Sequence, residues 1–355
     1  MLQRLLPLFA VVIGVAAPGL AQCLIPQNLI VSGGPGKDGI PALTNPVVVP
    51  AEAADTFLVP EDLVLGVVIN GEARAYPHGV LWWHEIVNDV LGGRPILVSF
   101  CPLTGSGIVS DPVLDGRLHN FGVSGLLFDN NLIMFDRTTE SLWSQMRLDS
   151  ICGDFSGTRP PLLPVVQSTW VAWKAMHPNT TAVSFDTGFN RNYNRYPYGD
   201  YDGIDNTRLL FPQTTIDSRL PMKENVLGIT HGEMSRAYPV YSASRLAGAA
   251  PRGAINDVVN GLSVLVVFDG PSQLAIPFDR MRESGEVLTF QLVENAGFPF
   301  LLRDQETGSL WDLNGVAVSG LLEGEQLRKI PTFTAFWFAW AAFNPGTELY
   351  SFAGE

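Results

Sequence analysis

Positive charge is scarce in this sequence. Of its 355 residues, 22 are Lys or Arg and 35 are Asp or Glu, which gives a formal net charge of −13. No basic run is present, so the electrostatic footprint of a nucleic-acid-binding protein is missing and attraction to anionic lipid is not expected. We therefore expect no nucleic acid as a partner, and the acidic balance selects no substrate by itself.

Long apolar runs are also missing beyond the N-terminus. A transmembrane helix needs about 18 or more uninterrupted apolar residues, and no segment after residue 22 reaches that length. Before it, Arg4, the apolar stretch 5–17 and the small residues around Ala21 have the pattern of a signal peptide over residues 1–21. The sequence thus predicts an exported protein, periplasmic or extracellular, with no transmembrane segment.

Cysteine is rare, and its odd count matters in an exported protein. Cys23, Cys101 and Cys152 are the three cysteines, so at least one is unpaired or modified. Residues 20–23 outline a lipoprotein box that Gln22 fits poorly, which leaves secretion or lipidation of Cys23 open. If Cys23 is lipidated or lies in a loose tail, Cys101 and Cys152 could form a disulfide.

Common catalytic motifs are absent as well. The sequence has no nucleotide-binding glycine loop, no His-Glu-x-x-His helix and no Gly-x-Ser-x-Gly elbow. These absences argue against the commonest NTPases, zincins and α/β-hydrolases, and leave other enzymes open.

The strongest positive signal is an internal repeat. Matched segments recur in the same order at offsets of 162 to 168 residues: 64–66 with 226–228, 74–77 with 236–239, 88–100 with 256–268, 141–143 with 309–311, and Trp170 and Trp173 with Trp337 and Trp340. We assign a first repeat to 62–185 and a second to 224–353. An N-terminal extension covers 22–61, and an insert covers 186–223.

Each repeat carries signals for short strands and few helices. Asn70-Gly71 predicts a hairpin, 81–90 a short helix, 95–100 a buried strand, and 118–136 further strands. A helix over 170–177 should stop at Pro178 and be followed by a strand over 181–185. The prediction is a β-rich α+β fold with two similar domains related by pseudo-twofold symmetry.

The insert has no counterpart in either repeat and is rich in tyrosine. It contains Tyr193, Tyr196, Tyr198 and Tyr201. A long segment of this kind is usually a lid or binding loop, or a packed strap that joins two domains. Both interpretations stay open from the sequence.

Reactive residues that occur in only one repeat point to a site. His84-Glu85 and Cys101 in the first repeat correspond to Arg252-Gly253 and Asp269 in the second. Other candidate pocket positions that differ between the repeats are Thr104, Ser106, Glu140 and Gln145, which become Ser272, Leu274, Gly308 and Leu313. Residues kept in both repeats are explained by folding, so we expect a functional site in the first repeat and a structural role for the second.

The same residues resemble a known family. The sequence is similar to the family called domain of unknown function 3179, through 75–77, 84–89, 101–106, 121–126 and 136–145. The resemblance spans nearly the whole mature chain and implies an exported bacterial or archaeal protein of unsettled activity. It also implies that a second Cys is frequent at position 104, where this chain has Thr104, which weakens a two-sulfur site.

Three functions are compatible with these residues. In the first, His84, Glu85 and Cys101 bind zinc or copper, with His231 or His119 as an extra ligand. In the second, Cys101 is the nucleophile of a thiol enzyme, His84 is its base, and Glu85 or Asp89 orients the imidazole.

The third function is a non-catalytic binding module for a small molecule or a protein. It would use the groove between the repeats and the insert, with Tyr196 and Tyr198 as contact residues, because tyrosine offers flat contact area and one hydrogen-bonding end. The sequence leaves the choice among the three open.

Overall fold

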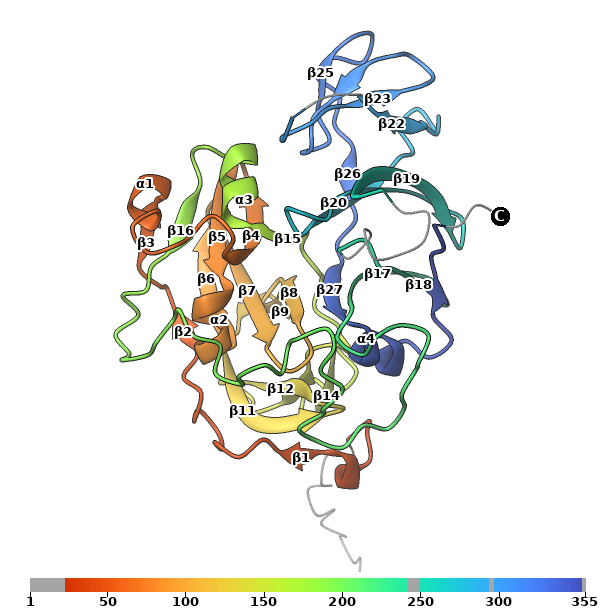
Figure 1. The fold of residues 1–355 in the computed structure, drawn as a ribbon. Coiled ribbons are helices and arrows are strands. Elements are labelled where there is room, and N and C mark those ends of the chain that lie inside the picture. Colours follow the sequence, from red (N-terminus) through yellow and green to blue (C-terminus); the bar gives the residue numbers. More distant parts are fainter. Residues whose placement is uncertain (1–22, 242–249, 294–296, 353–355) are drawn as a thin grey trace, which may run out of the picture.

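The structure is β-rich, with four short α-helices and one 3₁₀ helix (Gln27–Leu29) among the many strands of the described residues. It is a computed structural model that describes residues 23–241, 250–293 and 297–352 (Figure 1). The predicted signal peptide lies outside the described residues. None of the described helices is long and apolar enough to cross a membrane. The α-helices are α1 (Ala51–Ala54), α2 (His78–His84), α3 (Trp170–Met176) and α4 (Trp337–Phe343).

One sheet of each repeat has four strands in the same order and directions, and in the first repeat this sheet gains a fifth strand from the N-terminal extension. In the first repeat the order is β15 (Val166–Thr169), β4 (Leu63–Ile69), β5 (Glu72–Pro77), β16 (Thr181–Val183) and β3 (Val48–Pro50). In the second it is β27 (Phe333–Phe336), β17 (Asn225–His231), β18 (Met234–Tyr238) and β28 (Glu348–Leu349). Each sheet contains one parallel pair, β16 with β5 and β28 with β18.

Two further pairs of sheets match in the order of their consecutive strands, β6–β8 with β19–β21 and β11–β14 with β22–β25, and differ at the edges. In the first pair, one sheet contains β2 (Leu43–Thr44), β6 (Ile86–Leu91), β7 (Arg94–Cys101) and β8 (Ser106–Ser110). The other sheet contains β19 (Arg252–Val259), β20 (Leu262–Asp269), β21 (Leu274–Asp279) and β26 (Arg328–Lys329). In the second pair, one sheet contains β1 (Val31–Ser32), β11 (Phe121–Phe128), β12 (Asn131–Asp136), β13 (Leu142–Ser144) and β14 (Asp149–Cys152). The other sheet contains β22 (Phe290–Leu292), β23 (Leu302–Asp304), β24 (Leu310–Trp311) and β25 (Ala317–Ser319). A small ribbon pairs β9 (Val113–Leu114) with β10 (Arg117–Leu118).

Residues shared by both repeats make the same contacts. Asp89 accepts hydrogen bonds from Arg74 (2.6 Å) and Tyr76 (2.7 Å), and Asp257 accepts them from Arg236 (2.6 Å) and Tyr238 (2.7 Å). These residues tie the hairpin of each repeat to the next strand.

A glycine in each repeat is required by the helix that packs on it. A Cβ on Gly66 would lie 2.2 Å from the ring of Trp173, and one on Gly228 would lie 2.1 Å from that of Trp340. Both separations are far below van der Waals contact, so any side chain would displace the buried indole. The shared tryptophans are therefore core residues.

Two of the apolar cores take residues from both repeats. One packs β4, β5 and α3 of the first repeat against β20, β21 and the β22–β25 sheet of the second. The other packs β6–β8 and β11–β13 of the first repeat against β17, β18, β27 and α4 of the second. The packing is reciprocal: the sheet with β4 and β5 in the first repeat packs on the sheet with β20 and β21 in the second, and the sheet with β17 and β18 packs on the sheet with β6–β8.

The helix predicted over 81–90 is wrong at both ends. Helix α2 begins at His78 and ends at His84, and β6 follows at once. Glu85 at the junction has φ 57°, which a helix cannot continue. The hairpin at Asn70-Gly71 and the strand over 95–100 are confirmed, while the 170–177 helix ends at Met176 and its closing strand at Val183.

Candidate functional site

The turn at Glu85 decides how the predicted residues are arranged. In the second repeat Arg252 and Asp269 are paired residues of neighbouring strands and form an ion pair of 2.8 Å. In the first repeat the equivalent ladder ends at Ile86 and Ser99, because position 84 belongs to helix α2. The positive φ of Glu85 turns the chain between them, so adjacent residues 84 and 85 enter different surroundings.

His84 is engaged on both sides of its ring and does not join Cys101. Its Nδ1 lies 2.7 Å from the carbonyl oxygen of Pro41, and its Nε2 lies 2.8 Å from the hydroxyl of Tyr193. Burial lowers the pKa of His84. With both nitrogens occupied by protein groups, the imidazole has no free position for a metal or for the Cys101 proton.

Glu85 and Cys101 lie close together and are both buried. The Phe100 amide donates to the Glu85 carbonyl oxygen at 2.7 Å, which places residue 85 beside the end of β7. Burial raises the pKa of Glu85 to about 8. Burial, and next the nearby Glu85 carboxylate, raise the pKa of Cys101 to about 11, so at neutral pH its sulfur is a thiol that donates to the carbonyl oxygen of Asn130 (3.6 Å).

The Glu85 carboxyl opens onto an apolar pocket of about 340 Å³. We call this the Glu85 pocket. Its polar groups with side chains are Glu85 and Tyr198, and the remaining lining is apolar or glycine: Gly33, Pro35, Ile40, Leu103, Val123, Gly125, Leu126, Leu127, Leu132, Leu210 and Phe211. The walls come from the N-terminal extension, from β11 and β12, and from the insert.

The predicted pocket residues Thr104, Ser106 and Gln145 do come together, but in the interior. Asn131 Nδ2 donates to Thr104 Oγ1 (3.0 Å), Ser106 Oγ (3.2 Å) and Gln145 Oε1 (2.8 Å). Gln145 Nε2 in turn donates to Ser99 Oγ (3.1 Å). All of these side chains are buried, so they form a closed hydrogen-bond network beneath Cys101 and do not line the Glu85 pocket.

Glu140 and His231 lie away from the site. Glu140 is exposed and forms an ion pair with Lys37. His231 ends β17 in the second repeat, where its Nδ1 lies 3.1 Å from the carbonyl oxygen of Asn260. The predicted ligand set therefore does not converge, and no group of three or more His, Cys, Asp or Glu among the described residues could hold a metal ion.

The insert packs as a strap over the loop that follows β7. Tyr196 donates to the carbonyl oxygen of Pro102 and Tyr201 to that of Leu103, both at 3.0 Å. Tyr198 lines the Glu85 pocket, whereas Tyr196 lines a separate cavity of about 90 Å³ between the two repeats. Of the two interpretations of the insert, these contacts favour the strap.

The strap is also tied to the turn between β11 and β12. Asn130 Nδ2 donates to the carbonyl oxygens of Phe211 (3.0 Å) and Pro212 (3.3 Å), and Asn130 Oδ1 accepts the Phe211 amide (2.9 Å). Asp129 accepts two hydrogen bonds from Thr214. One wall of the Glu85 pocket is fixed in this way.

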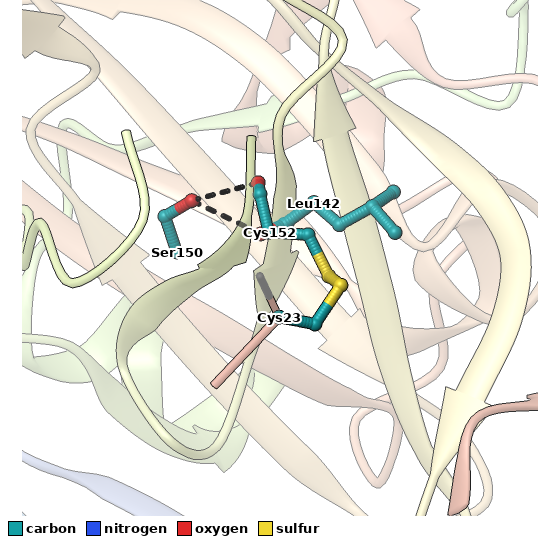
Figure 2. The surroundings of a disulfide bond; sticks show 4 residues. All are labelled: Cys23, Leu142, Ser150 and Cys152. Atoms are coloured by element: carbon teal, nitrogen blue, oxygen red, sulfur yellow. Dashed lines mark hydrogen bonds between the residues drawn. A yellow bond between two sulfur atoms is a disulfide. The ribbon is translucent and has the colours of Figure 1, made fainter. Parts of the chain in front are cut away.

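Cys23 is joined to Cys152 by a disulfide (Figure 2). The Leu24 amide donates to the carbonyl oxygen of Ile151 (2.8 Å), so the N-terminal extension is held against β14. The pairing of Cys101 with Cys152 is wrong, because Cys152 is taken and Cys101 is a free, buried thiol. A disulfide and a lipid on the sulfur of Cys23 are mutually exclusive.

Several residues of the site were missed by the sequence prediction. Asn130 and Asn131 carry the strap and the buried network, and Gly33, Pro35 and Ile40 of the N-terminal extension line the Glu85 pocket. The extension lies outside the repeats, so a comparison of the repeats could not find it. Asn131 could have been found, since it is equivalent to Pro299 at the offset of 168 residues.

Comparison with known proteins shows the family and nothing finer. Residues 37–347 match the family described as Protein of unknown function (DUF3179). No match was found among curated proteins or among solved structures. Because the match covers nearly the whole chain, this protein belongs to the DUF3179 family.

Proposed function

We propose that this chain is an exported, non-catalytic binding protein that holds a small, largely apolar molecule in the Glu85 pocket. The observation that carries the proposal is an apolar cavity of about 340 Å³ with one carboxyl and one phenol in its wall. Small-molecule sites have volumes of roughly 300–1,000 Å³, mostly apolar walls and a few polar groups that orient the ligand.

The state of Cys101 argues against the thiol enzyme. The nucleophile of such an enzyme is a thiolate, which needs a lowered pKa or a nearby base. Here burial raises the pKa of Cys101 to about 11, and the His84 ring is bonded to Pro41 and Tyr193. The scattered positions of His84, Glu85 and His231 likewise give no support to a zinc or copper site.

The disulfide supports export. Bonds of this kind form and persist in oxidising compartments such as the periplasm or the extracellular space. The Cys23–Cys152 bond joins the second residue after the predicted signal peptide to the first repeat. Export in this proposal is to the periplasm or the exterior, with Cys23 in the disulfide and no lipid on it.

We also propose that the fold arose by duplication and that the second repeat lost the site. The matching strand orders and the matching Arg-Asp-Tyr contacts support a common origin. Where the first repeat has Glu85 and Cys101, the second has Gly253 and the ion pair of Arg252 with Asp269. In this proposal the role of the second repeat is to complete the two apolar cores that both repeats share.

A neutral apolar fluorophore tests the proposal. N-phenyl-1-naphthylamine should bind the purified protein with enhanced emission and a stoichiometry near one. Leu210→Trp, which fills the pocket from a partly exposed rim position, should reduce that binding at least about tenfold. Leu321→Trp, at a fully solvent-facing site of the second repeat, is the matched control and should bind normally. Equal binding by both variants contradicts the proposal.

A further inference from the structure

Glu85 is a buried carboxyl that the protein leaves without a partner. Its side chain is 6% exposed, and no described residue hydrogen-bonds its carboxyl oxygens or forms an ion pair with it. The groups electrostatically coupled to it are the Cys101 thiol on β7 and the Tyr198 phenol of the strap, and neither carries positive charge. His84, the nearest histidine in sequence, faces Pro41 and Tyr193.

A buried carboxyl of this kind is costly. Charged side chains in protein interiors are normally paired, because removing an isolated ion from water costs several kcal/mol. Buried aspartates of this chain have such partners: Asp89 forms an ion pair with Arg74 and Asp269 with Arg252, while Asp304 accepts hydrogen bonds from Thr307 and Trp311. Glu85 has no such partner among the described residues, and it lines a cavity.

The lining of the pocket restricts the charge of its ligand. None of the described residues around the cavity is Lys, Arg or His, so an anionic group would meet Glu85 with no compensating charge. A cationic group on the ligand would supply the positive charge that no lining residue provides. The net charge of −13 also favours the approach of cations over anions.

We propose that the ligand of the Glu85 pocket is a lipophilic amine whose ammonium group pairs with the Glu85 carboxylate. This inference rests on the proposed binding function. The ammonium lies at the Glu85 end, within reach of the Tyr198 ring for a cation–π contact. The apolar body lies along Leu103, Leu127 and Leu132.

The size of the cavity sets the size of the amine. A volume of about 340 Å³ holds roughly eleven groups of the size of a water molecule, at about 30 Å³ each. One aromatic ring with a short aminoalkyl chain fills that space. Polyamines and peptides do not fit, because they carry further charges into apolar walls.

An isosteric ligand series tests the inference by calorimetry on the full chain. The probes are 2-phenylethylamine, 2-phenylethanol and 3-phenylpropionate, which share a ring and a two-carbon spacer. At pH 8 the amine should bind at least about tenfold more tightly than the alcohol, and the acid should not bind. In Glu85→Gln the alcohol should still bind and the preference for the amine should vanish.

Proton release gives a second readout that needs no variant. The pKa of Glu85 is about 8 in the empty protein, so below that pH the amine must displace the carboxyl proton. Titrations in two buffers of different ionisation enthalpy should show release of close to one proton at pH 6.5, and affinity should rise between pH 6.5 and 8. The alcohol should release none.

The outcomes separate this inference from the proposed function. If the alcohol binds as tightly as the amine, or the amine binds without proton release, the amine inference is overturned and the pocket stands. If none of the three ligands binds and N-phenyl-1-naphthylamine also fails to bind, both proposals fall.

Discussion

Glu85 combines a backbone conformation and a protonation state that are each unusual for glutamate. Its φ of 57° separates helix α2 from strand β6, and its carboxyl is buried without a partner. Strained conformations of this kind persist where the surrounding structure holds them, and they cluster at functional sites. The second repeat has Gly253 at this position.

Replacement of Glu85 by Gln should stabilise the protein at alkaline pH. The pKa of Glu85 is raised from 4.5 to about 8 on folding, so the native state holds a proton that the unfolded state has lost, and stability falls as pH rises through that window. The loss approaches about 1.4 kcal/mol per pH unit. Urea titrations should show the difference between Glu85→Gln and wild type growing from pH 5 to 8 and levelling above it.

An exposed carboxyl provides the control for this pH effect. Glu52→Gln on helix α1 alters a solvent-facing side chain and should stay within about 0.5 kcal/mol of wild type throughout. A Glu85→Gln difference that is flat from pH 5 to 9 would contradict the buried, protonated state.

Cys101 should be unreactive in the native protein. Its thiol is buried, and its pKa is about 11, so the thiolate is a minute fraction at pH 8. Iodoacetamide should leave the native chain unlabelled at pH 8 and modify one cysteine in urea without reductant, as read by intact mass. Rapid labelling of the folded protein would restore the thiol-enzyme hypothesis.

At the residue scale, the sequence predicted which residues to compare but not how their side chains are arranged. Comparison of the repeats singled out His84, Glu85 and Cys101, and two of these three lie together. The direction of His84 could not be predicted, because it depends on one positive φ that glutamate rarely adopts. Thr104, Ser106 and Gln145 were predicted to line a pocket; they lie together in an interior network that also contains Asn131.

Among the elements, the strap is the one that completes the pocket. It contributes Tyr198, Leu210 and Phe211 to the wall. Neither a helix nor a strand is present among its described residues, so its position depends on side-chain contacts. Those contacts could not be predicted from periodicity, since the segment has none.

Asn130→Ala should loosen the strap. The change removes hydrogen bonds to the backbone of Phe211 and Pro212 and to the side chain of Gln213, and we expect a loss of about 2–3 kcal/mol at about 1 kcal/mol per bond. Hydrogen exchange should rise around Phe211, and affinity for the apolar fluorophore should fall.

Asn45→Ala is the matched control for the strap variant. Asn45 also has positive φ (49°, against 61° for Asn130), but its side chain makes no hydrogen bond with a described residue. The Asn45→Ala variant therefore measures only the loss of unfolding free energy that alanine causes at a positive φ. Equal effects of the two substitutions would show that the strap does not depend on Asn130.

The boundaries of elements were harder to predict than their existence. The Asn70-Gly71 hairpin, the strand over 95–100 and the helix after Thr169 follow from turn residues and apolar patterns. The helix at 81–90 was wrong because 86–90 is apolar enough for either a buried strand or a helix. Pairing with β7 decides for the strand, and pairing is not visible locally.

At the scale of the whole molecule, the Cys23–Cys152 disulfide closes a covalent loop between cysteines that are 129 residues apart in the sequence. A cross-link restricts the unfolded chain, typically by 2–4 kcal/mol. Cys152→Ser should lower the free energy of unfolding by about that amount, with the fluorophore still bound because neither sulfur lines the pocket. Urea titration of variant and wild type measures it.

Under the proposed export, the same bond excludes a lipid on the sulfur of Cys23. In the protein secreted from its natural host or an equivalent one, intact mass should match a chain without lipid and 2 Da lighter than the reduced form. A diacylglycerol adduct on Cys23 would exclude the disulfide. Cys152 would then be a second free thiol that iodoacetamide could reveal.

Reciprocal cores make the two repeats interdependent. Because each of the two shared clusters is built half from one repeat and half from the other, a fragment carrying a single repeat would present large apolar faces to water. Chains cut within the strap should accordingly be insoluble apart and recover by complementation when co-expressed. Under the duplication proposed above, an ancestor of one repeat would have needed a second copy of itself to cover the same apolar faces.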